Sequence, residues 1–229
     1  MGDRELNPKL KVILQPAFPI CAGAAEGNGC HKKVTIDATK GHLPRGFFGA
    51  TGEIEDVELV LVVAEPGDPS EGDSTEDLLE TYNITTDVFD PKVLDSRTGK
   101  PTGGEFHEKV RYILDECFPN QLFEDQLRKV WFTESVLCSA EETTKYIKMS
   151  VVDECGHRYL RAQLELFPNA VIGALGGKAF ERIQRLKLKE RVIINAWAAA
   201  PPGCKRPPAK ISWQPIIDAV HKKRQQAHI

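Results

Sequence analysis

Residues 57–64 consist of leucine, valine and alanine apart from a single glutamate, Glu58. A strand that is apolar on both faces needs cover on both faces, as in a parallel sheet between two helical layers. Three more segments have strand character, at residues 130–137, 170–175 and 191–197. Helical periodicity appears at residues 106–118, 153–167, 178–188 and 213–226. This alternation predicts an α/β fold, a three-layer α/β/α arrangement around a mainly parallel four-stranded sheet.

The 229 residues contain no linker rich in serine and glycine, so the sequence predicts a single domain over residues 1–229. Residues 1–56 precede the first predicted strand and form an N-terminal arm that carries two cysteines. Residues 74–103 have weak periodicity and read as a long insertion loop, with a short helix at residues 76–82. Such an insertion is as consistent with a surface loop as with a substrate clamp.

Charge and hydropathy set limits on partners. The formal net charge is -3, so a role with nucleic acid requires a local basic face. Basic residues do gather in the C-terminal third, at residues 178–191 and 205–210, although a solvated helix face explains them as well. The apolar runs are too short to cross a membrane and the charged N-terminus precedes no signal-peptide core, so we expect a cytoplasmic protein without a membrane partner.

Loops follow the four predicted strands with the sequences AEPGDPSEGD, ESVLCSAEE, LGGKAF and AWAAAPPGCK. The carboxyl ends of parallel strands meet at one edge of a sheet, so these loops are expected to form one site. The first loop carries Glu65, Asp68 and Glu71 as candidate catalytic acids. An equally weighted interpretation makes these acids a solvated loop that caps a helix starting near Ser74.

Six cysteines in a chain expected in the cytoplasm favour thiols or metal ligands over disulfides. Cys117 sits among apolar residues and reads as a small core side chain. Cys138 and Cys155 are separated by 16 residues, and Cys21 and Cys30 by eight.

The order of these motifs resembles the uracil-DNA glycosylase superfamily, and most closely its iron–sulfur-containing branch. The resemblance runs from about Cys21 to the C-terminal helix. It is carried by the Pro-Gly turn and acids after the first strand, by GKPTGGEFHEKVRYIL, and by the long stretch from CSAEETTKY through FPNAVIGALGGKAF. The chain also departs from the family pattern: Ala64 stands at the position of the family's glutamate, with Glu65 one place later. Thr102 replaces a stacking phenylalanine, Glu134 replaces an asparagine, and AWAAAPPGC lacks the family's His-Pro-Ser motif.

The resemblance implies a DNA glycosylase that hydrolyses the N-glycosidic bond of uracil or another deaminated or modified base. Glu65 or Asp68, with Glu71 in reserve, would orient the attacking water or stabilise the sugar cation. The implied base-binding residues are Pro66, Gly67, Thr102, Phe106, Glu134, Ser135 and Asn195. A carboxylate at Glu134 suits an amino group unless it is protonated, which favours a base other than uracil, unless Glu134 faces solvent and Ser135 reads the base.

DNA, as a single strand or a duplex with a flipped base, is the implied partner, and the oligomeric state is left open. The implied DNA contacts are Gly177, Lys178, Trp197, Lys205 and Arg206. The implied cofactor is a structural 4Fe-4S cluster on Cys21, Cys30, Cys138 and Cys155, with zinc as the weaker metal and His31 and His157 as substitute ligands. Two alternatives stay open: a DNA-binding protein of this fold with little or no activity, and an unrelated α/β nucleotide-binding enzyme.

Overall fold

The computed structural model describes residues 4–19, 21, 41–69, 75–139 and 147–227. Its centre is a five-stranded sheet of β1 (Phe48–Gly49), β2 (Leu59–Val63), β3 (Val130–Glu134), β4 (Val171–Leu175) and β5 (Ile193–Ala196), in the order β1-β3-β2-β4-β5. The strands β3, β2, β4 and β5 are parallel, which confirms the predicted four-stranded sheet. The short β1 adds an antiparallel edge, with Phe48 paired to Phe132.

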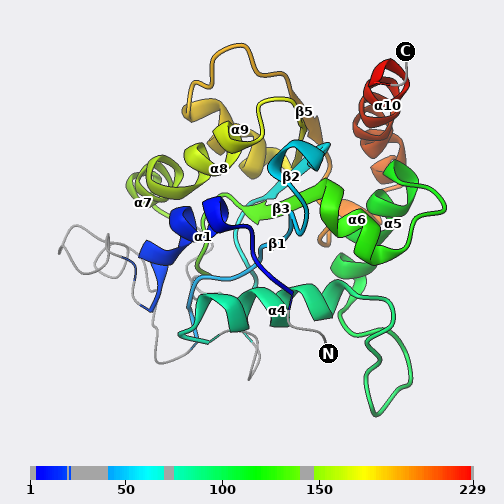
Figure 1. Ribbon diagram of the computed structural model, residues 1–229, viewed down its shortest axis with the longest axis horizontal. Helices are drawn as coiled ribbons and strands as arrows, with labels where there is room; N and C mark the ends of the chain where they lie inside the picture. The colour runs from blue at the N-terminus through cyan, green and yellow to red at the C-terminus, as the bar shows by residue number, and fades with distance from the viewer. Residues whose placement is uncertain (1–3, 20, 22–40, 70–74, 140–146, 228–229) are drawn as a thin grey trace.

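Alternate side chains of the sheet enter two separate cores, which explains why β2 is apolar throughout. Val60 and Val62 point into one core, and Leu59, Leu61 and Val63 into the other. The first core is closed by α1 (Pro8–Leu14), η1 (Gln15–Ala17), α7 (Met149–Cys155), the π-helical turn η4 (Gly156–Leu160), α8 (Arg161–Leu166) and α9 (Gly177–Arg185). The second is closed by α5 (Glu105–Cys117), α6 (Phe123–Lys129) and α10 (Ala209–Ala227). Figure 1 shows these two groups of helices on opposite sides of the sheet.

The helix α4 (Leu78–Phe89) runs along the bottom of the molecule in Figure 1 and contributes to both cores, through Tyr82 and Phe89. The sequence predicted only a short helix inside a loop here, because threonines occupy inward positions of α4 where apolar residues would show a periodicity. Thr81 and Thr86 are fully buried, and Thr86 Oγ1 donates to the Tyr82 carbonyl at 2.7 Å. Asp77 caps the first turn by accepting from the Glu80 N–H at 2.8 Å.

The other predicted helices are confirmed, within a few residues of their expected ends. Short 3-10 turns, η3 (Ile54–Asp56) and η5 (Gly203–Lys205), precede β2 and α10. Cys117 is fully buried, as predicted, and burial raises the pKa of its thiol to about 12. No helix in the described ranges is long and apolar enough to span a membrane.

Candidate functional site

A cavity of about 770 Å³ opens at the carboxyl edge of the sheet. Residues from all four strand-end loops line it: Glu65 to Asp68 after β2, Glu134 at the end of β3, Leu175 at the end of β4, and Ala198 to Ala200 after β5. The volume is within the usual range for a pocket that holds a small molecule. The convergence follows from the parallel topology, which brings these chain segments to the same edge.

The loop after β2 is positioned by a residue that the sequence did not single out. Arg45 is buried, and its guanidinium donates to the Gly67 carbonyl and, at 3.3 Å, to the Gly41 carbonyl. Pro66 is buried beside it, whereas Gly67 and Asp68 are exposed at the rim of the cavity. The segment before β1 therefore holds the loop in place.

Glu65 lines the cavity, but its carboxylate is bound by two cations of α9. Its Oε2 accepts from Arg182 Nη1 at 2.5 Å, and its Oε1 accepts from Lys178 Nζ at 3.1 Å. Arg182 also donates to the Ala64 carbonyl at 2.7 Å. The carboxylate of Glu65 is therefore held in an ion-pair network. Asp68 keeps an exposed carboxylate, and Glu71 lies outside the described residues.

Glu134 is 4% exposed and lines the cavity, so the interpretation that it faces solvent is wrong. In the part of the chain that the structure describes, no hydrogen-bond partner meets its Oε2. Burial raises the pKa of Glu134 well above its usual range, and the nearby charge of Glu65 raises it further. The positive charges of Arg45 and Arg182 act in the opposite direction and are the weaker influence.

Gly46 makes room for this carboxyl group. Its φ is +79°, and a Cβ built on it would lie 2.7 Å from Glu134 Cγ and 2.8 Å from Glu134 Oε1. A side chain at this position would push Glu134 out of place, so the glycine is required by both the backbone conformation and the close approach.

Ser135 is not among the residues that line the cavity. Its hydroxyl donates to the Ala64 carbonyl at 2.6 Å and accepts from Arg182 Nη1 at 3.0 Å. The donor of Ser135 and one of its two acceptor lone pairs are therefore used inside the protein, and a role of Ser135 in reading the base stays a prediction.

Aromatic rings form one wall of the cavity. Phe106 was expected there, and the structure adds Phe89, Phe132 and His107. The Phe89 ring lies 5.4 Å from that of Phe132 and 4.7 Å from that of His107, between centroids. His107 Nδ1 accepts from the Gly104 N–H at 3.1 Å. The sequence singled out neither Phe132, which lies in the middle of β3, nor His107, which lies near the start of α5.

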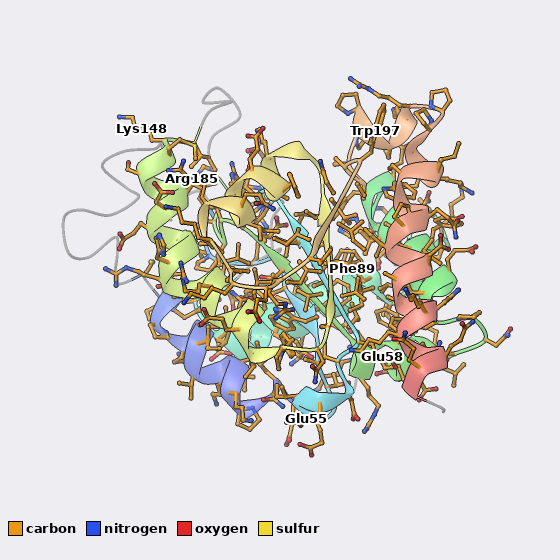
Figure 2. All side chains as sticks on the ribbon, turned by 90° about the horizontal axis from the view of Figure 1, so that it is seen from above. Glu55, Glu58, Phe89, Lys148, Arg185 and Trp197 are labelled. Atoms are coloured by element: carbon orange, nitrogen blue, oxygen red, sulfur yellow. The ribbon has the colours of Figure 1, made fainter. Side chains whose placement is uncertain are left out.

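Several residues predicted to touch the base or DNA do not line the cavity. Thr102 lies in the segment that joins α4 to α5, and its hydroxyl donates to the Val93 carbonyl of the same segment at 3.2 Å. Asn195 is exposed on the edge strand β5. Trp197 lies at the outer edge of the molecule near the start of α10, whereas Phe89 is interior (Figure 2). The Arg206 guanidinium covers the Trp197 ring at 4.8 Å from its centroid.

The basic residues do not form one uniform face. Gly177 and Lys178 begin α9, with Lys178 bound to Glu65, and Arg185 pairs with Asp153 at 2.6 Å. Arg191 donates to carbonyls at the end of α8 and before β4. Lys205 is exposed and pairs with Glu105 at 3.5 Å. Much of the positive charge expected for nucleic acid therefore serves internal contacts, and Lys205 and Arg206 stay at the surface.

Three of the four predicted metal ligands line a second, smaller cavity of about 20 Å³: Cys21, Cys138 and Cys155. Cys21 Sγ is 3.1 Å from the Tyr159 hydroxyl, and the Leu137 N–H donates to Cys155 Sγ at 3.5 Å. Cys30 and His31 lie outside the described residues, and His157 is exposed. Among the residues that are described, no group of three histidine, cysteine, aspartate or glutamate side chains is arranged to hold a metal ion.

No family model and no curated protein matches the sequence. Among solved structures, the chain is similar to the wild-type SMUG2 of Pedobacter heparinus, with 13% identity and a TM-score of 0.48. That likeness covers 76% of this chain and 77% of the other. Conclusions about function therefore rest on the residues of the cavity.

Proposed function

We propose that this protein is a DNA glycosylase that removes uracil or another deaminated or modified base. The observation that carries the proposal is the cavity at the carboxyl edge, where a buried carboxyl group, Glu134, stands beside a wall of phenylalanine rings. A glycosylase must hold a base that has left the stack, by contact with its faces and hydrogen bonds to its edge. Two segments that carry the resemblance to the uracil-DNA glycosylase superfamily, the Pro-Gly turn at residues 66–67 and residues 103–107, contribute to the lining of this cavity.

The reaction breaks the bond between the sugar C1′ and the base nitrogen, while a water oxygen bonds to C1′ and its proton is released. The transition state carries positive charge on the sugar and negative charge on the base. Asp68 is the exposed carboxylate on the rim, and we assign it the role of orienting the water and stabilising the sugar. The N–H groups of Gly67 and Asp68 would face the departing base.

The test uses oligonucleotides that each contain one altered base, incubated with the protein and then cut with alkali at abasic sites. We expect strand cleavage for at least one base. Asp68→Asn should lower the rate by about a hundredfold or more, because it removes the charged group that assists the water. Asp218→Asn, which alters an exposed carboxylate on α10, is the matched control and should keep the wild-type rate.

A second function is favoured by one specific observation. Glu65, the acid nearest to the family's catalytic position, is held by Arg182 and Lys178. A carboxylate occupied in this way is less available to assist a water molecule, which is consistent with a protein of this fold that binds DNA without releasing a base. The two functions separate in one experiment: a gel shift of DNA without release of any base rejects the enzyme and leaves the DNA-binding protein.

We further propose a structural 4Fe-4S cluster on Cys21, Cys30, Cys138 and Cys155. The support is that Cys21, Cys138 and Cys155 line one cavity although they come from three separate segments of the chain. Four thiolates are the ligand set that such a cluster requires, and it would tie the N-terminal arm to α7.

The cluster is tested by the visible spectrum of freshly purified protein together with iron and sulfide analysis. Cys138→Ala and Cys155→Ala should each remove the absorption, whereas Cys204→Ala, a buried cysteine outside that cavity, should not. If the protein is colourless and contains zinc, the site is a zinc site and not an iron–sulfur cluster. If the protein contains no metal, both proposals are wrong.

A further inference from the structure

The buried end of the cavity holds one polar side chain that has an unused hydrogen-bonding atom. Glu134 is 4% exposed, and no donor or acceptor within the described ranges meets its Oε2. A buried polar atom without a partner is costly, and it is kept where a ligand supplies the missing bond. Gly46 leaves the space that this carboxyl group occupies, since a Cβ at that position would lie 2.7 Å from Glu134 Cγ and 2.8 Å from its Oε1.

The two guanidinium groups whose charge acts on Glu134, those of Arg45 and Arg182, donate hydrogen bonds to other groups. From the segment before β1, Arg45 donates to the Gly67 and Gly41 carbonyls. From α9, Arg182 donates to Glu65 Oε2 and to the Ala64 carbonyl. The negative charge of Glu65 is the strongest charge acting on Glu134, and Asp68, Asp95 and His107 line the same cavity.

A neutral carboxylic acid carries an O–H donor and a C=O acceptor side by side, whereas a carboxylate only accepts. The neutral form therefore presents the same pair of roles as the amide of asparagine or glutamine. We propose that Glu134 binds the substrate base as a neutral carboxylic acid, donating from its O–H to a ring carbonyl and accepting from the adjacent ring N–H. This inference rests on the proposed function and assigns it a substrate class: bases with a lactam edge, such as uracil.

An amidine edge, as in cytosine, could also pair with a carboxylic acid. Glu65 is the strongest single charge acting on Glu134, and the weaker charges of Arg45 and Arg182 oppose it, so the titration compares uracil with cytosine directly. A neutral Glu134 also removes the reason for favouring a base other than uracil, which assumed an ionised carboxylate.

The pH dependence has a definite sign. Burial and the charge of Glu65 raise the pKa of Glu134, so the neutral form persists to a higher pH than for an exposed glutamate. Binding of the base is fully present below this pKa and is lost as the pH rises through it. Above the pKa, the affinity should fall about tenfold per pH unit.

The test is a titration of the purified protein with uracil and cytosine, each methylated at N1 where the sugar would be attached, and with 1,3-dimethyluracil, followed by NMR over the pH range in which the protein stays folded. The wild type should bind uracil at low pH and lose affinity as the pH rises, while 1,3-dimethyluracil, which has no ring N–H, binds at least about tenfold more weakly. Glu134→Gln should bind uracil more weakly than the wild type at low pH but with a flat pH profile, because an amide does not titrate. Glu134→Ala should bind weakly at every pH, with thermal unfolding used to verify that each variant is folded.

Four results would overturn the inference: no uracil binding by the wild type at any pH, binding that strengthens with pH, tighter binding of cytosine than of uracil, or a Glu134→Gln variant as weak as Glu134→Ala. Failure of the proposed function looks different. Uracil binding with the expected pH profile but no release of base from DNA would leave the assignment of Glu134 intact and reject the catalytic role.

Discussion

Gly46→Ala adds a single carbon atom, and it tests both the backbone conformation at this position and the space beside Glu134. The φ of +79° at Gly46 is in the left-handed region, which costs a residue with a Cβ about 1–2 kcal/mol. The added Cβ would also stand 2.7 Å from Glu134 Cγ, so the Glu134 side chain must move. A loss of about 1–2 kcal/mol in a chain of 229 residues lowers the Tm by roughly 2–8 °C.

The same substitution should weaken uracil binding by about tenfold, since the carboxyl group of Glu134 leaves its position. Thermal denaturation measures the first effect and the NMR titration the second. Gly67→Ala is the matched control: this residue also lines the cavity, but no heavy atom lies within 4 Å of the position of its Cβ. It should retain the wild-type Tm.

A double variant separates the two causes. In Gly46→Ala with Glu134→Ala, the clash disappears because the glutamate Cγ and carboxyl group are gone, while the backbone cost remains. The combined loss of stability should therefore be smaller than the sum of the single losses. A Gly46→Ala protein with wild-type stability and uracil affinity, or a double variant with a strictly additive loss, would refute the reasoning.

Three other substitutions have defined outcomes. Arg182→Met should lower the unfolding free energy in urea by about 2–4 kcal/mol, because Glu65, the Ala64 carbonyl and the Ser135 hydroxyl each lose one of their donors. Arg185→Met, at an exposed ion pair, should lower it by at most about 1 kcal/mol, and equal losses would contradict the central role of Arg182. Tyr82→Phe should lower the free energy of unfolding by about 1–2 kcal/mol, because the Gly49 carbonyl loses the hydroxyl that donates to it at 2.9 Å. Thermal denaturation measures this loss, and an unchanged Tm would contradict the hydrogen bond. Arg206→Ala should change the free energy of unfolding by less than about 1 kcal/mol. It should weaken DNA binding and reduce the salt dependence of binding by about one released counterion. An unchanged salt dependence would show that Arg206 is not part of the DNA interface.

The sheet and its layers were predictable because their residues repeat with a fixed period. The run at residues 57–64 identified a strand covered on both faces, and the loops after the strands identified the edge where the cavity lies. The strand β1 was not predictable, since two residues show no period. The length of α4 was underestimated because threonines fill its inward positions. The hydroxyl of Thr81 is hydrogen-bonded to that of Thr75, and the hydroxyl of Thr86 donates to the helix backbone.

The site was predictable at the level of loops but not of contacts. Glu134 was selected by its place after a strand, but its burial depends on Gly46, almost ninety residues earlier in the chain. Arg45 had no local signal at all. The partners of Glu65 come from α9, more than a hundred residues later, and no pattern within one segment reveals such a pair.

The pairing of β1 with β3 has a consequence for how the chain reaches its native state. Phe48 stacks on Phe132 at 5.0 Å between ring centroids, although the two are far apart in sequence. During synthesis β1 leaves the ribosome long before β3. The side chains of Phe47 and Phe48 therefore stay exposed to water until β3 has been synthesised and can pack against them. Contacts of such high sequence separation slow folding and prolong the exposure of apolar surface. Expression at lower temperature, which slows self-association of these intermediates, should therefore raise the yield of native protein.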